Sequence, residues 1–97
     1  MSDEQGNTVL TRTVTIPNRR GLHARAAARF VAAAERFCAT VDVLKDGQTV
    51  SSRSIMGLMM LGAGKGSEIE IRAEGWDASE ALETLAGLVE AGFDEAD

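Results

Sequence analysis

The sequence has few of the residues that bring disulfides, metals or aromatic ligand contacts to a small protein. Its 97 residues include one cysteine, Cys38, one histidine, His23, and only 4% aromatic residues. A single cysteine excludes an internal disulfide, and one histidine with one cysteine does not form the ligand pattern of a zinc site. No apolar run approaches the roughly 20 residues of a membrane-spanning helix. We therefore expect a protein with no metal site and no membrane insertion.

Positive charge is also scarce, since the formal net charge is -5. Nucleic-acid-binding proteins usually carry a basic face that neutralises phosphates, so nucleic acid is a disfavoured partner. The bases are unevenly distributed, because Arg72 is the only one from residue 68 onward. This asymmetry predicts a locally positive face near residues 19–29 on an otherwise acidic protein. The arginines of the first 40 residues are Arg12, Arg19, Arg20, Arg25, Arg29 and Arg36.

The length corresponds to one domain with one core. We expect a flexible N-terminal tail over residues 1–8, the folded domain over 9–93 and an acidic C-terminal tail over 94–97. The first residues, MSDEQGNT, are polar and acidic, which is the opposite of a secretion signal. We therefore expect a cytoplasmic location, where the thiol of Cys38 stays reduced. Because Cys38 continues an apolar helical spacing, it is predicted to pack in the core.

The periodicity of apolar residues changes several times along the first half of the chain. Residues 9–16 alternate as a strand, which Pro17 ends. From Ala24, apolar residues recur at three- and four-residue steps, which predicts an amphipathic helix of about 14 residues. Residues 40–45 and 48–51 are predicted to be two strands of a hairpin, since Asp46-Gly47 is typical of a two-residue turn.

The second half contains one short helix, one strand and one longer helix. Ser54 as N-cap and Gly62 as terminator predict a methionine-rich helix over residues 54–61, followed by a strand over 68–73. Asp77 with Glu80 resembles a capping box at the start of the last helix. The order of elements predicts an α+β fold, in which helices cover one face of an antiparallel sheet.

The only histidine lies at the predicted start of the first helix, in Gly21-Leu22-His23-Ala24-Arg25. A helix N-terminus offers unpaired N–H groups and partial positive charge, which would both stabilise a phosphoryl group on the imidazole. The guanidinium of Arg25 would add charge-assisted hydrogen bonds. An imidazole is largely neutral, and therefore nucleophilic, in the cytoplasm. The local spacing alone favours an ordinary residue at a helix start.

The short helix also has two interpretations. If Leu58 and Leu61 face the sheet, then Ile55, Met56 and Met59 face outward. Outward methionines would form an adaptable docking surface, whereas inward ones would simply complete the core. Similarly, Ser54 is either only a helix cap or a phosphorylation site, where the helix dipole favours the added negative charge.

Two separate segments resemble the HPr family of phosphocarriers. GLHARAAARFV, residues 21–31, resembles the family's active-site segment, and SIMGLM, residues 54–59, resembles its regulatory-serine helix. Leu61-Gly62 and Lys65-Gly66 continue the pattern, and the resemblance spans roughly residues 9–93. It implies an open-faced β-sandwich, in which a four-stranded antiparallel sheet is covered on one face by three helices in the order βαββαβα.

The resemblance implies a monomeric component of the phosphotransferase system rather than a stand-alone enzyme, and one that needs no metal or cofactor of its own. His23 would accept a phosphoryl group on Nδ1 from phospho-Enzyme I, which is charged from phosphoenolpyruvate, and pass it to an Enzyme IIA. Arg25 matches the arginine that stabilises this group. Ser54 matches the serine modified by HPr kinase/phosphorylase in organisms that have this enzyme, and phosphoserine there would weaken Enzyme I binding. The docking patch would comprise Ile55, Met56 and Met59, with Arg29 at its polar edge.

Two features depart from the common family pattern. The usual proline after the active-site arginine is replaced by Ala26, which would leave the His23 loop less fixed. The turn at residues 18–21 is longer than in many members of the sugar system. Together with the GFDEAD ending, residues 92–97, this turn is closer to the nitrogen-related branch, called NPr.

Two other functions are compatible with parts of the sequence. A ferredoxin-like binding module shares the βαββαβ order, although low aromatic content argues against RNA binding. A regulatory HPr relative would be controlled through Ser54 and carry no phosphoryl group. Such relatives lack the histidine, so His23 and Arg25 argue against this alternative.

Overall fold

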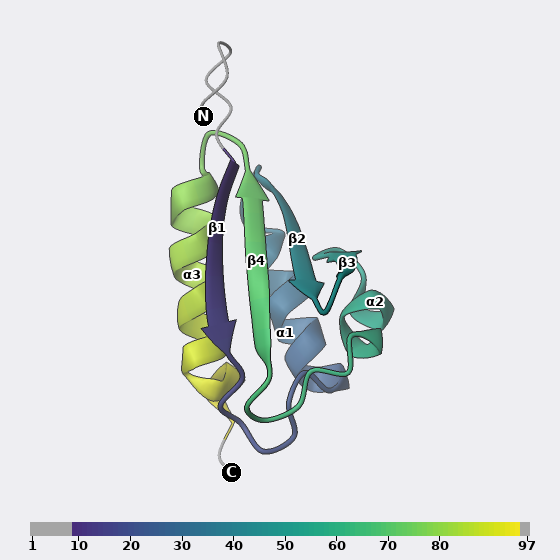
Figure 1. Ribbon diagram of the computed structural model, residues 1–97. Coiled ribbons are helices and arrows are strands. Elements are labelled where there is room, and N and C mark those ends of the chain that lie inside the picture. Colours follow the sequence, from purple (N-terminus) through teal and green to yellow (C-terminus); the bar gives the residue numbers. More distant parts are fainter. Residues whose placement is uncertain (1–8, 96–97) are drawn as a thin grey trace.

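The computed structural model describes residues 9–95, so the predicted tail at residues 1–8 and the last two residues lie outside it. Four strands form one antiparallel sheet in the order β1-β4-β2-β3. The helices lie on one face of this sheet (Figure 1), which confirms the predicted α+β open-faced sandwich. In chain order the elements are β1 (Val9–Thr15), α1 (Ala24–Ala34), β2 (Thr40–Lys45), β3 (Gln48–Ser51), α2 (Ile55–Met60), β4 (Glu68–Glu74), α3 (Ala78–Glu90) and the 3-10 turn η1 (Gly92–Asp94).

The sheet buries one face because its side chains alternate along each strand. In the internal strand β4, Ile69 and Ile71 are fully buried, and Glu70 between them points to the open face. The register places Val14 of β1 beside Ile69 and Val43 of β2 beside Ile71. The buried face is therefore a continuous apolar surface across three strands.

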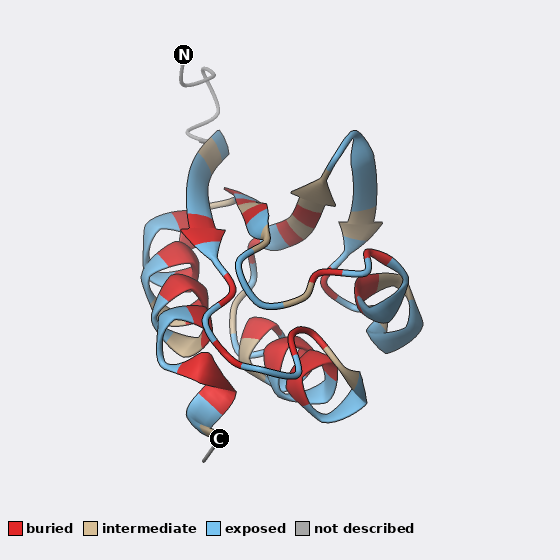
Figure 2. Cartoon of the chain, turned by 60° about the horizontal axis from the view of Figure 1, so that its bottom comes forward, coloured by how far each residue is buried: buried red, intermediate tan, exposed pale blue. Residues whose placement is uncertain are grey.

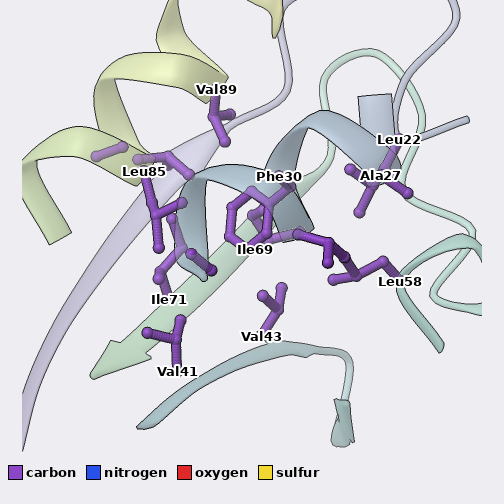
Figure 3. Close-up of a cluster of buried hydrophobic side chains, with 14 of the residues drawn as sticks. Leu22, Ala27, Phe30, Val41, Val43, Leu58, Ile69, Ile71, Leu85 and Val89 are labelled. Atoms are coloured by element: carbon purple, nitrogen blue, oxygen red, sulfur yellow. The ribbon is translucent and has the colours of Figure 1, made fainter. Parts of the chain in front are cut away.

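The first helix supplies the centre of the core. Phe30 of α1 lies in a cluster with Val43, Ile69 and Leu58 of α2 (Figure 3), and only 1% of its surface is exposed. Burying such a ring stabilises the fold by about 1.5–3 kcal/mol. Leu58 and Leu61 are both buried, which agrees with the interpretation in which these two leucines face the sheet.

The end of α1 and the place of Cys38 differ from the prediction. The helix has 11 residues and ends at Ala34, and Cys38 lies beyond it with its side chain exposed. The N–H groups of Arg36 and Phe37 donate to carbonyls three residues back, at Ala33 and Ala34. These tighter bonds turn the chain toward β2. The apolar spacing past Ala34 was thus misleading, and the prediction that Cys38 packs in the core is wrong.

The predicted capping box at Asp77 is also wrong. Asp77 is the N-cap of α3, but its side chain makes no cap hydrogen bond. Its carboxylate instead accepts hydrogen bonds of 2.8 Å from the N–H groups of Cys38 and Ala39. The neighbouring turn offers this buried carboxylate two charge-assisted hydrogen bonds, and these connect the start of α3 to the start of β2.

Candidate functional site

The residues predicted to carry the chemistry meet at one end of the molecule. There β1 ends, α1 begins and the chain leaves α3 (Figure 1). Figure 2 looks onto this end, where the loop from β1 to α1 contains the buried residues Asn18, Gly21 and Leu22. This loop is therefore packed into the molecule, so the residue that follows it has a defined position.

Gly21 allows this loop to lie directly on the loop that joins α2 to β4. Its φ is +67°, and a Cβ there would lie 2.3 Å from the carbonyl oxygen of Ala63 and 2.7 Å from Cα of Gly64. The next N–H, of Leu22, donates to that same carbonyl of Ala63 at 2.9 Å. Only a glycine fits this approach, which sets the position of His23.

His23 is the N-cap of α1. Its backbone is extended, with φ −77° and ψ −177°, and its Nδ1 accepts a hydrogen bond from the N–H of Arg25 at 3.3 Å. The lone pair of Nδ1 therefore points at the first turn of the helix. A group attached to Nδ1 would meet the unpaired N–H groups and the positive end of the helix dipole.

The other ring nitrogen of His23 contacts an acid from the end of the chain. Nε2 makes a hydrogen bond to Oε2 of Glu95, whose Oε1 accepts from Nδ2 of Asn18 at 2.9 Å. Nδ2 of Asn18 also donates to the carbonyl of Gly21 at 2.9 Å. The side chains of His23 and Glu95 are only 17% and 12% exposed. The imidazole is thus held between a carboxylate and a helix N-terminus.

Sequence reasoning missed both Asn18 and Glu95 as site residues. In the sequence, Asn18 is part of the turn after Pro17, and Glu95 is part of the acidic ending. The side chains of Asn18 and Glu95 meet across 77 residues of sequence, so no local spacing reveals the contact. The Pro-Asn turn and the acid-rich ending were the available signals, and each has a simpler local explanation.

The chain ending is anchored on α1 by Arg29. The guanidinium Nη1 of Arg29 donates to the carbonyl of Phe93, whose side chain is fully buried. Phe93 and Asp94 have φ values of 58° and 60°, in the left-handed region. Arg29 was expected at the polar edge of a docking patch, and here its guanidinium also fixes the turn that carries Glu95.

Arg25 is exposed, and within residues 9–95 its guanidinium makes no ion pair or side-chain hydrogen bond. It therefore remains available to an incoming anionic group near Nδ1. A hollow of about 240 Å³ adjoins the site and is lined by His23, Arg20, Leu22, Met59 and residues 62–64. The hollow brings the imidazole, a basic side chain and a methionine of α2 to one surface.

The outer side of α2 is apolar and exposed, as one of the two interpretations predicted. Met56 is 67% exposed, and Ile55 and Met59 also face solvent. Met60, which was not predicted, is exposed as well. Ser54 is the N-cap, since its Oγ accepts from the N–H of Gly57 at 2.8 Å.

The described residues show no sign of a metal centre or a membrane segment. Across residues 9–95, no three or more His, Cys, Asp or Glu side chains gather so as to hold a metal ion. None of the helices in that range combines the length and apolar character needed to cross a bilayer.

Comparison with known proteins gives one consistent family. Residues 10–91 match the family model described as PTS HPr component phosphorylation site. The phosphocarrier protein NPr of Shewanella violacea is 43% identical over 92% of this chain and 98% of its own length. The phosphocarrier protein HPr of Neisseria meningitidis serogroup A is 42% identical over 92% of this chain and its full length.

Solved structures agree with the sequence relatives. The crystal structure of HPr-C-His from Thermoanaerobacter tengcongensis superposes with a TM-score of 0.85. It is 42% identical, and the match covers 91% of this chain and 99% of that one. With a family model over most of its length, full-length relatives and the same fold, the chain belongs to the HPr family of phosphocarrier proteins of the phosphotransferase system.

Proposed function

We propose that this protein accepts a phosphoryl group on Nδ1 of His23 from the phosphohistidine of Enzyme I and transfers it to an Enzyme IIA. The observation that carries the proposal is the hydrogen bond from the N–H of Arg25 to Nδ1. It marks Nδ1 as the nitrogen with a lone pair and places it at the N-terminus of α1. After transfer, phosphoryl oxygens would accept from the N–H groups of the first turn.

Arg25 completes the anion site of this proposal. Phosphoryl transfer depends mainly on positioning and on stabilising charge on the phosphoryl oxygens. The helix N-terminus supplies fixed dipoles, and the exposed guanidinium of Arg25 supplies a mobile full charge beside them. Neither the helix N-terminus nor the Arg25 guanidinium needs a metal or a cofactor for this role. We therefore expect the phosphoryl group to be the only group that the protein carries.

Incubation with Enzyme I and phosphoenolpyruvate tests the proposal. The intact mass should rise by one phosphoryl group, acid should remove it, and peptide mapping under alkaline conditions should place it on His23. Omitting Enzyme I should leave the mass unchanged. An Enzyme I that phosphorylates the Neisseria relative but never labels this protein would contradict the proposal.

The exposed side of α2 is proposed as the surface that Enzyme I and Enzyme IIA contact. Met59 lines the same hollow as His23, so a protein covering the imidazole would also cover this helix. Met56→Glu should slow phosphorylation at limiting protein concentration by at least about tenfold, which corresponds to ~1.4 kcal/mol. The reason is that docking would bury an unpaired carboxylate.

Trp76→Glu is the matched control for Met56→Glu. Trp76 is 77% exposed and belongs to the loop between β4 and α3. Figure 1 shows this loop at the opposite end of the sheet from the start of α1. The Trp76→Glu substitution adds the same charge away from the site. The phosphorylation rate of this variant should stay near that of the unaltered protein. Equal rates for both variants would mean that α2 takes no part in docking.

Ser54 is proposed as a regulatory phosphorylation site. Its Oγ already lies at the N-terminus of α2, where the dipole favours a dianion, and it is next to the exposed Ile55 and Met56. HPr kinase/phosphorylase with ATP should give an acid-stable phosphoprotein that Ser54→Ala eliminates. Ser51→Ala, which alters an exposed serine of β3, should be labelled normally. If Ser54→Ala were labelled as well, Ser54 would be a helix cap only.

A further inference from the structure

We propose that Glu95 is a positioning residue for phosphoryl transfer, which keeps the proton on Nε2 of His23 and stabilises the charge that the ring gains. The inference rests on the proposed function, because it assumes that Nδ1 accepts the phosphoryl group. The contacts that suggest it are those of the Glu95 carboxylate with the imidazole and with Asn18.

The two hydrogen bonds of the imidazole define its tautomer. A neutral imidazole has one N–H donor and one lone pair, and a carboxylate can only accept. Because Nε2 faces the carboxylate of Glu95, Nε2 carries the proton. Nδ1 then has the lone pair, which agrees with its accepting from the N–H of Arg25. Glu95 therefore makes Nδ1 the nucleophile.

The same contact matters during transfer. The lone pair of Nδ1 attacks the phosphorus of the donor phosphohistidine, the donor's P–N bond breaks, and its electron pair returns to the donor imidazole. Nε2 keeps its proton, so the ring of His23 becomes cationic when the N–P bond forms. The carboxylate of Glu95 balances this charge in a setting with little solvent screening, since its side chain is only 12% exposed. A cationic ring is also a better leaving group for onward transfer.

Contacts of its own side chain and of the turn before it hold Glu95 against the ring. Asn18, which is 3% exposed, donates to Oε1 and so orients the carboxylate. Arg29 holds the carbonyl of Phe93, and the buried Phe93 side chain anchors the turn. The left-handed φ of Phe93 is unfavourable for a residue with a side chain, so tertiary contacts must maintain this conformation. Such maintained strain is typical of segments that position a functional group.

Glu95→Gln and Glu95→Ala separate shape from charge. Glutamine keeps an acceptor oxygen but removes the charge, whereas alanine removes both. Asp94→Asn is the matched control, because it removes the same charge one residue away at an exposed position and asparagine tolerates its φ of 60°. Circular dichroism identifies any variant that fails to fold.

The first readout uses the unphosphorylated protein and is independent of Enzyme I. The Nε2 proton of the unaltered protein and of Asp94→Asn should give a downfield NMR signal because it is hydrogen-bonded. It should exchange slowly because the side chains around it keep water away. Glu95→Ala should lose the signal. A signal that is absent from the unaltered protein, or unchanged in Glu95→Ala, would overturn the inference.

The second readout is transfer itself. At saturating phospho-Enzyme I, Glu95→Gln and Glu95→Ala should be phosphorylated about tenfold more slowly, with the concentration of half-saturation unchanged. The pH profile of phosphohistidine hydrolysis, which the ring proton promotes, should differ between Glu95→Gln and the unaltered protein, because only the carboxylate favours the cationic ring. A merely structural role for Glu95 would leave this pH profile unmoved.

The outcomes distinguish the two proposals. An unaltered protein that takes no label on His23 contradicts the proposed function, whatever the Glu95 variants do. Normal labelling of the unaltered protein, with the same rate and pH profile in Glu95→Gln, contradicts only the role of Glu95.

Discussion

His23→Asn is expected to abolish the acid-labile phosphoprotein completely while the domain remains folded. His23 is the only histidine of the chain, so no second imidazole can take the phosphoryl group. An asparagine amide is not a nucleophile for phosphorus under these conditions. It is, however, among the preferred N-cap residues, and it would replace the cap that Nδ1 now supplies to the N–H of Arg25.

The measurement is intact mass after incubation with Enzyme I and phosphoenolpyruvate, with a thermal melt on the same sample. His23→Ala should be equally inactive but less stable by about 1 kcal/mol, because it removes the cap as well. The pair thus separates the chemistry of the imidazole from its structural contribution. Acid-labile label on His23→Asn would show that another residue carries the phosphoryl group.

Gly21→Ala is expected to destabilise the protein by about 3 kcal/mol. Two costs add at this position. The φ of +67° is unfavourable for any residue with a Cβ, and the new Cβ would overlap the carbonyl oxygen of Ala63 at 2.3 Å. This oxygen belongs to backbone that also accepts from Leu22, so it cannot move without breaking that bond. The loop that carries His23 must shift instead, and phosphorylation should slow even below the melting temperature.

Gly62→Ala is the control that isolates the steric overlap. Gly62 has nearly the same φ, +66°, but a Cβ there would have no neighbour within 4 Å. Its loss of stability should be only about 1 kcal/mol, the cost of the left-handed backbone. Chemical denaturation of both variants measures the difference. Equal losses would mean that the approach of Gly21 to Ala63 does not constrain the loop.

The element order was predictable because it depends on short-range patterns. The alternation of β4 and the Asp46-Gly47 turn, whose φ values of 49° and 82° are both positive, are properties of neighbouring residues. The N-cap positions of His23 and Ser54 are equally local, since a cap bonds within three residues of itself. The positions of these two side chains at helix starts were therefore predictable from the sequence.

The errors concern residues whose surroundings come from distant parts of the chain. The apolar spacing placed Cys38 in the core, yet the turn toward β2 exposes it. Asp77 has the sequence context of a cap, but a turn 38 and 39 residues away offered its carboxylate better donors. A local pattern indicates which contacts a side chain is able to make. Which of these contacts form depends on the residues that the fold brings next to it.

The same distinction applies to the site. Residues 21–31 alone predict a nucleophilic imidazole at a helix N-terminus with an arginine beside it, because helix geometry places these groups together in any fold. Which ring nitrogen carries the proton depends on Glu95, which lies 72 residues away and reaches His23 only after α3 has packed on the sheet. Hydrogen-bond partners across such distances are set by packing rather than by sequence spacing, so the tautomer of His23 follows from the tertiary structure.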